Sequence, residues 1–287
     1  MRLLLYEWCC SGGMQSELAH DILQEVSVED FLREGRLMLE AFTSDAEQNT
    51  DLDITVMVDS TLPVTKAPHF SKNVTVEKIA PSKSQLSLLT MAAAVDLIIL
   101  IAPETHGVLL QTINTVEQAG FGNKLINCPT PFIKAASDKE ITCRMLSAAG
   151  IPTPAGRTIA TGESFPHGFR LPAVLKARRS AGCDGLTIIH KPTDFSAPRT
   201  DSRLECHISG TPGSVCCLCG TDSIVPLLPF EQVFTEASHP VYIGGRVIHN
   251  DFHTRMHSLA VRSIETLNKT TQSKARGWVG VDMILGS

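Results

Sequence analysis

This sequence of 287 residues has no block of basic residues, and its formal net charge is −5, so nucleic acid is not the partner we expect. It also lacks an apolar run long enough to span a bilayer, because the longest, AAAVDLIILIAP, is interrupted by Asp96. The opening MRLLLYEWCC is too short in its apolar part for a secretory signal. We therefore expect a cytoplasmic protein without a membrane partner.

Familiar nucleotide and metal motifs are missing as well. No GxxxxGKS/T string is present, which excludes a Walker A loop, and the full GxGxxG of a dinucleotide fold is absent. The nine cysteines are odd in number and irregularly spaced, which favours reduced, buried thiols over disulfides or a zinc site. His249, His253 and His257 could bind a metal if one helix carried all three, but no Glu follows in HExxH fashion, so a solvated helix face, or histidines that meet an acidic substrate, is the favoured interpretation.

Strands and helices alternate over the first 130 residues. This order predicts a parallel α/β sheet, and ligands of such sheets bind at the carboxyl ends of the strands, here 7–13 and 103–106. The predicted strands are 2–8, 53–59, 74–80, 95–103 and 124–129, and the predicted helices are 28–43, 84–93 and 105–119.

Short strands separated by Gly and Pro turns dominate after Pro154, which predicts antiparallel sheets and thus an α+β C-terminal part. Residues 192–202 are predicted to be a polar connection, 252–270 a helix and 277–285 a last strand. Turns are predicted at Gly162, Gly185, 210–213 and Gly220.

Two lysines lie in informative surroundings. Lys139 belongs to SDKEITCRMLSAAGIPTP, where a helix is predicted to open at Ser137 or Asp138 and to stop at Gly150. Lys176 ends the apolar strand LPAVLKA, and a loop rich in Gly and Ser follows. Two cations beside a loop of backbone N–H groups suit a triphosphate. Lys139 could also be an ordinary surface lysine, although the helix dipole mildly disfavours a cation in the first turn.

These segments resemble the ATP-grasp superfamily over residues 125–287. The Lys139 helix is similar to the family's first lysine helix, and VLKARRSAGCDGL to its second lysine and lid. RLECHISGTPGSV resembles the adenine hinge, and VGVDMIL the strand that presents a metal-binding carboxylate. The resemblance implies a pre-ATP-grasp α/β domain over 1–130 and an ATP-grasp domain over 131–287, with a lid subdomain at about 151–205.

The resemblance also implies roles for single residues. Lys139 and Lys176 would contact phosphate oxygens of ATP, and Asp282 would hold Mg²⁺ or Mn²⁺. Glu104, at a strand end, is a candidate for the amine or acceptor substrate. The remaining candidates are Ser180, Gly182 and Gly185 in the loop over the phosphates, Glu205, Cys206 and Ile208 in the adenine hinge, and Arg179 and Arg255 as catalytic cations.

The implied activity is an ADP-forming, ATP-dependent carboxylate–amine ligase that works through an acyl phosphate. LLLYEWCCSGG, IAPET and CLCGTDSIVPLLPFEQ further resemble small ATP-grasp ligases of one-carbon coenzyme assembly, a group that includes the tyramine–glutamate ligase of methanofuran biosynthesis. Small-molecule carboxylate and amine substrates are therefore expected, and a homodimer is compatible with the resemblance.

One family feature is missing from these residues. In the family, a second strand ending in E-x-N-P-R follows the Asp strand, whereas this sequence stops five residues after Asp282. We therefore expect the C-terminal end of the fold to be missing and a sheet edge to be open. The alternative to an active ligase is a nucleotide-binding but catalytically silent protein, or a truncated fragment.

Overall fold

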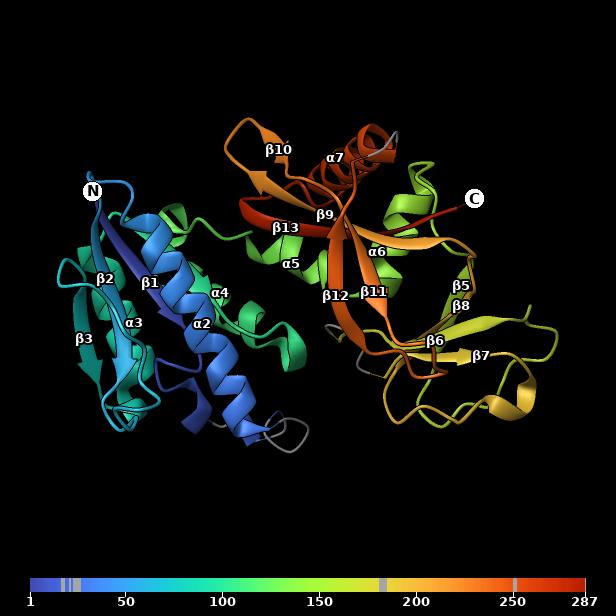
Figure 1. Cartoon of the computed structure of the whole chain (residues 1–287), viewed down its shortest axis with the longest axis horizontal. Helices are drawn as coiled ribbons and strands as arrows, with labels where there is room; N and C mark the ends of the chain where they lie inside the picture. The colour runs from blue at the N-terminus through green and yellow to red at the C-terminus, as the bar shows by residue number, and fades with distance from the viewer. Residues whose placement is uncertain (17–18, 21, 23–26, 181–184, 250–251, 287) are drawn as a thin grey trace. The chain divides into compact units, whose positions relative to one another are not determined.

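The computed structural model describes residues 1–16, 19–20, 22, 27–180, 185–249 and 252–286. The chain divides into two compact units, Met1–Asn127 and Cys128–Ser287, which Figure 1 shows from blue to red along the chain. Among the described residues, no helix is long and apolar enough to cross a membrane.

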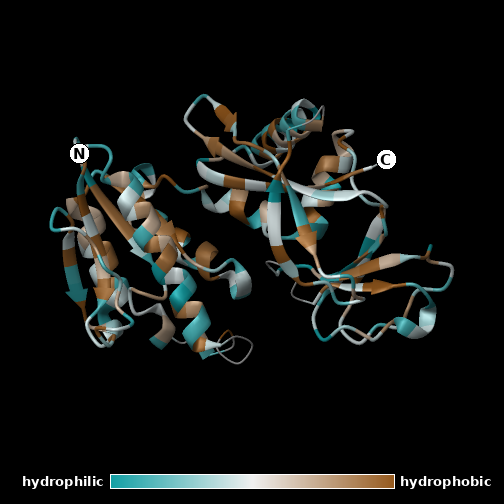
Figure 2. Cartoon of the chain, viewed as in Figure 1, coloured by the Kyte–Doolittle hydropathy of each residue, from teal (hydrophilic) through white to brown (hydrophobic). Residues whose placement is uncertain are grey.

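The N-terminal unit is built on a parallel four-stranded sheet of order β3-β2-β1-β4, with Leu3 of β1 opposite Ile54 and Leu97. β1 is an apolar run whose residues Leu4 and Leu5 are fully buried, and Figure 2 shows it as hydrophobic. The predicted parallel sheet is confirmed. Its elements are β1 (Arg2–Glu7), η1 (Gly13–Gln15), α2 (Val28–Ala46), β2 (Asp53–Asp59), β3 (Thr75–Ile79), η2 (Pro81–Lys83), α3 (Ser84–Ala94), β4 (Leu97–Ile101), η3 (Thr105–Gly107), α4 (Val108–Gln118) and η4 (Gly122–Lys124).

Helix α2 shows why these segments fold as they do. The side chain of Ser27 caps it by accepting a hydrogen bond from the peptide N–H of Asp30. Its buried residues are spaced three or four apart and include Gly35, which lies against the buried carboxylate of Glu7. A Cβ at Gly35 would lie 2.6 Å from Glu7 Oε2, so this close approach requires glycine.

The predicted strand at 124–129 is wrong. Leu125 makes only an isolated bridge with Ile98, and the side chain of Asn127 takes the place of a strand backbone. Its Oδ1 accepts from the N–H of Leu100 at 2.8 Å, and its Nδ2 donates to the Leu100 carbonyl at 2.7 Å. The edge of β4 is thus satisfied by this amide side chain together with the Ile126 N–H, which donates to the Ile98 carbonyl at 2.9 Å, and the chain then enters α5 after Pro129.

The C-terminal unit contains two antiparallel sheets, as predicted. One has the order β5-β8-β6-β7, and the other has the order β10-β9-β11-β12 with β13 paired to β9. β11 and β12 were not predicted, and β9 already begins at Thr211, inside the turn predicted at 210–213. The elements are α5 (Thr130–Ala136), α6 (Lys139–Ala148), β5 (Gly156–Ile159), β6 (Ala173–Ala177), β7 (Thr187–Ile189), η5 (Pro192–Asp194), β8 (Ser202–Cys206), β9 (Thr211–Cys219), β10 (Ile224–Pro226), β11 (Phe230–Phe234), β12 (Tyr242–Val247), α7 (Phe252–Thr271) and β13 (Gly277–Leu285).

Helix α7 covers one face of the second sheet. Its buried side includes Met256, and a Cβ on Gly213 of β9 would lie 2.7 Å from Met256 Cε. Met283, which is opposite Gly213 in β13, therefore points to the same face. Because strand side chains alternate, Asp282 points to the opposite face.

Candidate functional site

Asp138 fixes the start of α6, the helix that begins with Lys139. Its buried carboxylate accepts from the peptide N–H groups of Glu140 and Ile141 at 3.1 and 3.3 Å, and from Arg178 Nη2 at 2.6 Å. Burial alone would raise the pKa of Asp138, but these hydrogen bonds outweigh it and hold the pKa below its usual value. Asp138 therefore ties α6 to the end of β6.

Lys139 lies against the loop that follows β6. Its peptide N–H donates to the Arg178 carbonyl at 3.0 Å, and its Nζ donates to the carbonyl and hydroxyl of Ser180 at 2.7 and 3.2 Å. Gly182 lies outside the described residues. Gly185, where the description resumes, has φ +66°, which glycine adopts without strain. The structure thus brings Lys139 together with Ser180 at the start of the predicted phosphate loop.

Lys176 meets a buried carboxylate on the neighbouring strand. Its Nζ lies 2.6 Å from Oε2 of Glu205, and Oε1 of Glu205 lies 2.7 Å from Nε of Arg203. The side chains of Arg203 and Glu205 are only 5% and 4% exposed, whereas that of Lys176 is 25% exposed. Lys176 is therefore held by Glu205 and still partly open to solvent.

The same network reaches α6. Arg203 forms an ion pair with Glu140, and its Nη2 donates to the Pro154 carbonyl at 3.1 Å. Burial alone would lower the pKa of Arg203, but its hydrogen bond to Glu205 and the charge of Glu140 raise it. The network therefore joins α6, the helix that begins with Lys139, to the strand that carries Lys176.

Cys143 completes this cluster. Its Sγ donates to Oε1 of Glu205 at 3.7 Å, and burial is the main cause that raises the pKa of its thiol. A neutral thiol adds no charge to the cluster. The two negative charges of Glu140 and Glu205 are therefore balanced by the two positive charges of Arg203 and Lys176.

The predicted adenine hinge follows β8. The peptide N–H of Cys206, at its end, donates to the Ala155 carbonyl at 2.8 Å, and that of His207 donates to the Pro172 carbonyl at 3.0 Å. Neither N–H is available to adenine in this arrangement. Two backbone groups of the segment remain candidates for adenine binding. They are the carbonyl of Cys206 and the peptide of Ile208, a residue that is 43% exposed.

Asp282 lies exposed on β13, opposite Ser214. Its Oδ1 accepts from Gln232 Nε2 of β11 at 3.1 Å. A carboxylate and an amide carbonyl are hard oxygen donors, and Mg²⁺ commonly uses one or two carboxylates together with substrate phosphates. The donors therefore fit Mg²⁺, although the described residues contain no group of three or more His, Cys, Asp or Glu side chains that could hold a metal by themselves.

Arg179 lies at the margin of this cluster, and the candidates Arg255 and Glu104 belong to other elements. Arg179 is 72% exposed and approaches Asp138 with its Nε at 3.4 Å. Arg255 lies on α7, near the ring of Phe252, and α7 covers the sheet face opposite Asp282. Glu104 is exposed in the N-terminal unit, just before η3.

The histidine hypothesis is not supported by the described residues. His253 and His257 lie on α7 with ring centroids 4.1 Å apart, but His249 precedes the helix and so does not share its face. Nε2 of His257 lies 2.8 Å from the carbonyl of Leu227.

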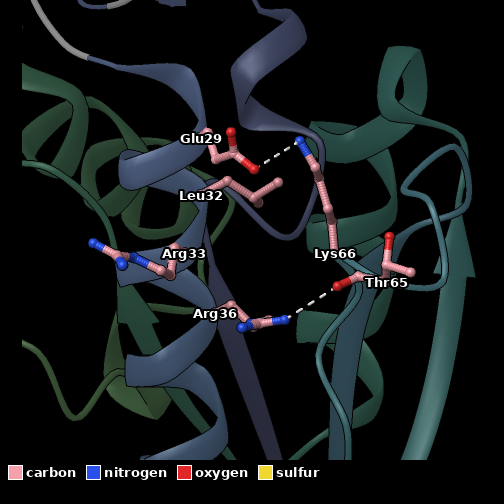
Figure 3. Close-up of a pocket in the computed structure, with 6 residues that line it drawn as sticks. All are labelled: Glu29, Leu32, Arg33, Arg36, Thr65 and Lys66. Atoms are coloured by element: carbon pink, nitrogen blue, oxygen red, sulfur yellow. Dashed lines mark hydrogen bonds and ion pairs between the residues drawn. The ribbon is translucent and has the colours of Figure 1, made fainter.

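A small cavity of about 110 Å³ lies in the N-terminal unit, between α2 and the turn after β2 (Figure 3). Lys66 pairs with Glu29 at 3.4 Å, and Arg36 Nη1 donates to the Thr65 carbonyl at 3.4 Å. These contacts pin the turn to the helix. The cavity contains none of the predicted site residues.

Sequence reasoning missed Arg203, Glu140 and Cys143 as members of the cluster. The sequence did contain a signal for Arg203. Arg203 and Glu205 are two positions apart on one strand, so their side chains share a face, and charged side chains on a buried strand need partners. The spacing of Glu140 and Cys143 carried no comparable signal.

Comparison with known proteins agrees with this architecture. A family model described as an ATP-grasp domain matches residues 136–287, and one described as a pre ATP-grasp 3 domain matches residues 52–133. No curated protein matches the sequence.

Solved structures share the fold. An ATP-grasp superfamily protein from Archaeoglobus fulgidus has a TM-score of 0.68 at 19% identity, over 100% of this chain and 77% of that one. D-alanine–D-alanine ligase from Bacillus anthracis, complexed with ATP, has a TM-score of 0.59 at 15% identity, over 100% and 82%. L-amino acid ligase from Bacillus licheniformis has a TM-score of 0.61 at 12% identity, over 100% and 64%. These identities show similarity of fold alone.

Proposed function

The chain belongs to the ATP-grasp domain family, and on that premise we propose that it is an ADP-forming ligase that joins a carboxylate to an amine. A carboxylate oxygen of one substrate would attack the γ-phosphorus of ATP and release ADP. The amine of the second substrate would then attack the acyl carbon and release phosphate. Two of the proteins that share the fold are named as ligases of amino acids, which supports this reaction class.

The observation that carries the proposal is the cluster joining α6, β6 and β8. It anchors Lys139 to Ser180 at the beginning of the loop after β6, and it holds Lys176 on β6 itself, a strand that cannot shift without breaking β-ladder hydrogen bonds. An ammonium group has three donors, so Lys176 can keep its contact with Glu205 while it donates to a phosphate oxygen. Lys139 would exchange its Ser180 contacts for phosphate oxygens.

Asp282 and Gln232 would hold Mg²⁺, or Mn²⁺, together with phosphate oxygens. The metal, when bound, neutralises charge on the phosphates. The contribution of the chain itself is alignment and charge, because the two lysines would orient the triphosphate. No covalent intermediate with a protein side chain is required.

For the narrower class, we propose small ligases similar to the tyramine–glutamate ligase group. The support is the resemblance of three segments, which lie at the end of β1, at the end of β4 and between β9 and β11. In the N-terminal unit, Glu104 at the carboxyl end of β4 remains the candidate for the amine or acceptor substrate.

Calorimetric titration of the full chain with MgATP tests the proposal. We expect micromolar binding that weakens at least tenfold in Lys176→Ala. The matched control is Lys191→Ala, because Lys191 lies in the same sheet region but is 72% exposed. A folded chain that does not bind MgATP, or equal affinities in all three proteins, would contradict the proposed function.

A further inference from the structure

We propose that the cavity between α2 and the turn after β2 binds a small monocarboxylate, whose carboxylate group lies between Arg36 and Lys66 and whose short apolar chain lies against Leu32. The inference goes beyond the proposed function, because the cavity belongs to the N-terminal unit and contains none of the residues proposed to bind ATP or metal.

The cavity has two walls that are already in place, as Figure 3 shows. One wall is a single face of α2, on which the lining residues are spaced at i, i+3, i+4 and i+7. The other wall is the turn that contains Thr65 and Lys66. The N–H groups of Lys66 and Ala67 both donate to the Pro63 carbonyl, at 2.8 and 2.9 Å, so the turn is closed by its own hydrogen bonds. A ligand would therefore bind without reorganising the backbone.

Arg36 is short of hydrogen-bond partners. Among the described residues, none accepts a hydrogen bond from its buried Nε, and the contact of its Nη1 with the Thr65 carbonyl is long, at 3.4 Å. Glu40 lies 4.0 Å from Nε, beyond hydrogen-bond distance, and its Oε1 accepts instead from the His69 N–H at 2.9 Å. A carboxylate in the adjoining cavity would reach the outer N–H groups of the guanidinium and compensate its charge.

The charges around the cavity favour a monoanion. Lys66 pairs with Glu29 at 3.4 Å across one end, whereas Arg36 has no lining carboxylate at the other end among the residues described there. Arg33 also lines the cavity, but its guanidinium points away from Lys66 in Figure 3 and pairs with Asp30 at 3.1 Å. The cations that face the cavity thus exceed the carboxylates by one, which a singly charged ligand would balance.

The size and the apolar wall narrow the class further. An apolar cavity of about 150 Å³ holds benzene, so one of about 110 Å³ holds roughly four or five non-hydrogen atoms. Leu32, which is 7% exposed, provides an apolar surface between the two charged ends. A carboxylate with a chain of two or three carbons fits both features.

The position of the cavity separates it from the candidate acceptor residue. Helix α2 joins the parallel strands β1 and β2, so its first half lies at the carboxyl edge of the sheet, where ligands of such sheets bind. In the strand order β3-β2-β1-β4, the cavity lies on the side of β2, whereas Glu104 follows β4. We therefore infer a second ligand site in this unit, and not another part of the site at Glu104.

Nuclear magnetic resonance of the full chain tests the site through the Nε–H signal of Arg36, assigned with Arg36→Lys. The probe is propionate, and propionamide is its uncharged counterpart of the same shape. Sodium chloride keeps the ionic strength constant, because screening alone weakens exposed ion pairs. We expect propionate to shift the signal in a saturable manner, with an affinity at least tenfold higher than that of propionamide.

Two charge-removing variants locate the effect. Lys66→Gln should weaken propionate binding at least tenfold, and because Lys66 is an exposed side chain on a turn, this variant keeps the fold. Arg33→Gln should change the affinity less than threefold, since this guanidinium points away from Lys66. Lys72→Gln is the matched lysine control, because Lys72 is exposed later in the same connection and does not line the cavity.

The alternative outcomes each contradict the proposal. Equal responses to propionate and propionamide would mean that the cavity does not recognise charge. Equal weakening by Lys66→Gln and Lys72→Gln would mean general electrostatic attraction without a site. Saturable binding of inorganic phosphate but not of propionate would show the wrong class of anion. Lys176→Ala, which tests the proposed function, should leave propionate binding unchanged, so the two proposals can fail separately.

Discussion

In the sheet β5-β8-β6-β7, the side chains of Arg203 and Glu205 are 5% and 4% exposed and pair with each other, whereas in the sheet that includes β13, Asp282 is exposed beside an amide. The first sheet matches its charges internally, so its ions fix α6 and the strand ends in place. Among the described residues, the carboxylate of Asp282 on the second sheet has the Gln232 amide as its partner and forms no ion pair. The contrast indicates that charge at the first sheet serves mainly to position groups, and charge at the second serves mainly to bind a ligand.

Replacing Arg203 by Met should have the largest effect on stability, because it leaves the carboxylates of Glu140 and Glu205 with one cation fewer. Removing one partner of a buried ion pair typically costs about 3–5 kcal/mol. Urea unfolding at pH 7 measures the change. Arg199→Met is the matched control, since Arg199 is exposed, and it should change the free energy of unfolding by less than about 0.5 kcal/mol. Equal effects of the two substitutions would mean that the buried network does not position the sheet.

Replacing Asp138 by Asn should have an intermediate effect of about 1–3 kcal/mol, because Asn can still cap α6 but cannot neutralise Arg178. The pKa of Asp138 is lower in the folded chain than in the unfolded chain. Its stabilising contribution is therefore complete above the unfolded-state pKa of about 3.9, and it is lost as the pH falls through the folded-state pKa.

Urea unfolding of both proteins between pH 7 and pH 3 checks this sign. The stability difference should be constant from pH 7 to 5 and shrink below pH 4. Asp201→Asn provides the control, because Asp201 also faces Arg178 but is 61% exposed and 4.0 Å away. A difference that grows on acidification would contradict the assignment.

The sequence predicted those features of the fold that depend on local pattern. The apolar run of β1, the cap of α6 at Asp138 and the alternation along β13 follow from spacing and capping chemistry. Asn127 shows where this reasoning stops, because a side-chain amide that satisfies Leu100 cannot be distinguished from a short strand by periodicity.

The candidate site was predictable only in part, for a related reason. Lys176 and Glu205 could each be selected as a charge in an apolar strand, but their contact depends on the pairing of β6 with β8, which are separated by a long connection. The contact of Glu140 with Arg203 depends in turn on how α6 packs against strands β6 and β8. Such partners follow from tertiary register and not from spacing along the chain.

Replacing Asp282 by Asn should have the smallest effect on stability and the clearest effect on binding. The side chain is exposed and Asn can still accept from Gln232, so the free energy of unfolding should change by less than about 0.5 kcal/mol. Removing the carboxylate should nevertheless abolish the dependence of ATP affinity on Mg²⁺, measured by calorimetry with and without the metal. Asp222→Asn, on an exposed turn of the same unit, should leave that dependence intact. If Asp282→Asn instead destabilised the chain by more than about 1 kcal/mol, or kept its response to Mg²⁺, the carboxylate would be structural and the contrast between the two sheets would disappear.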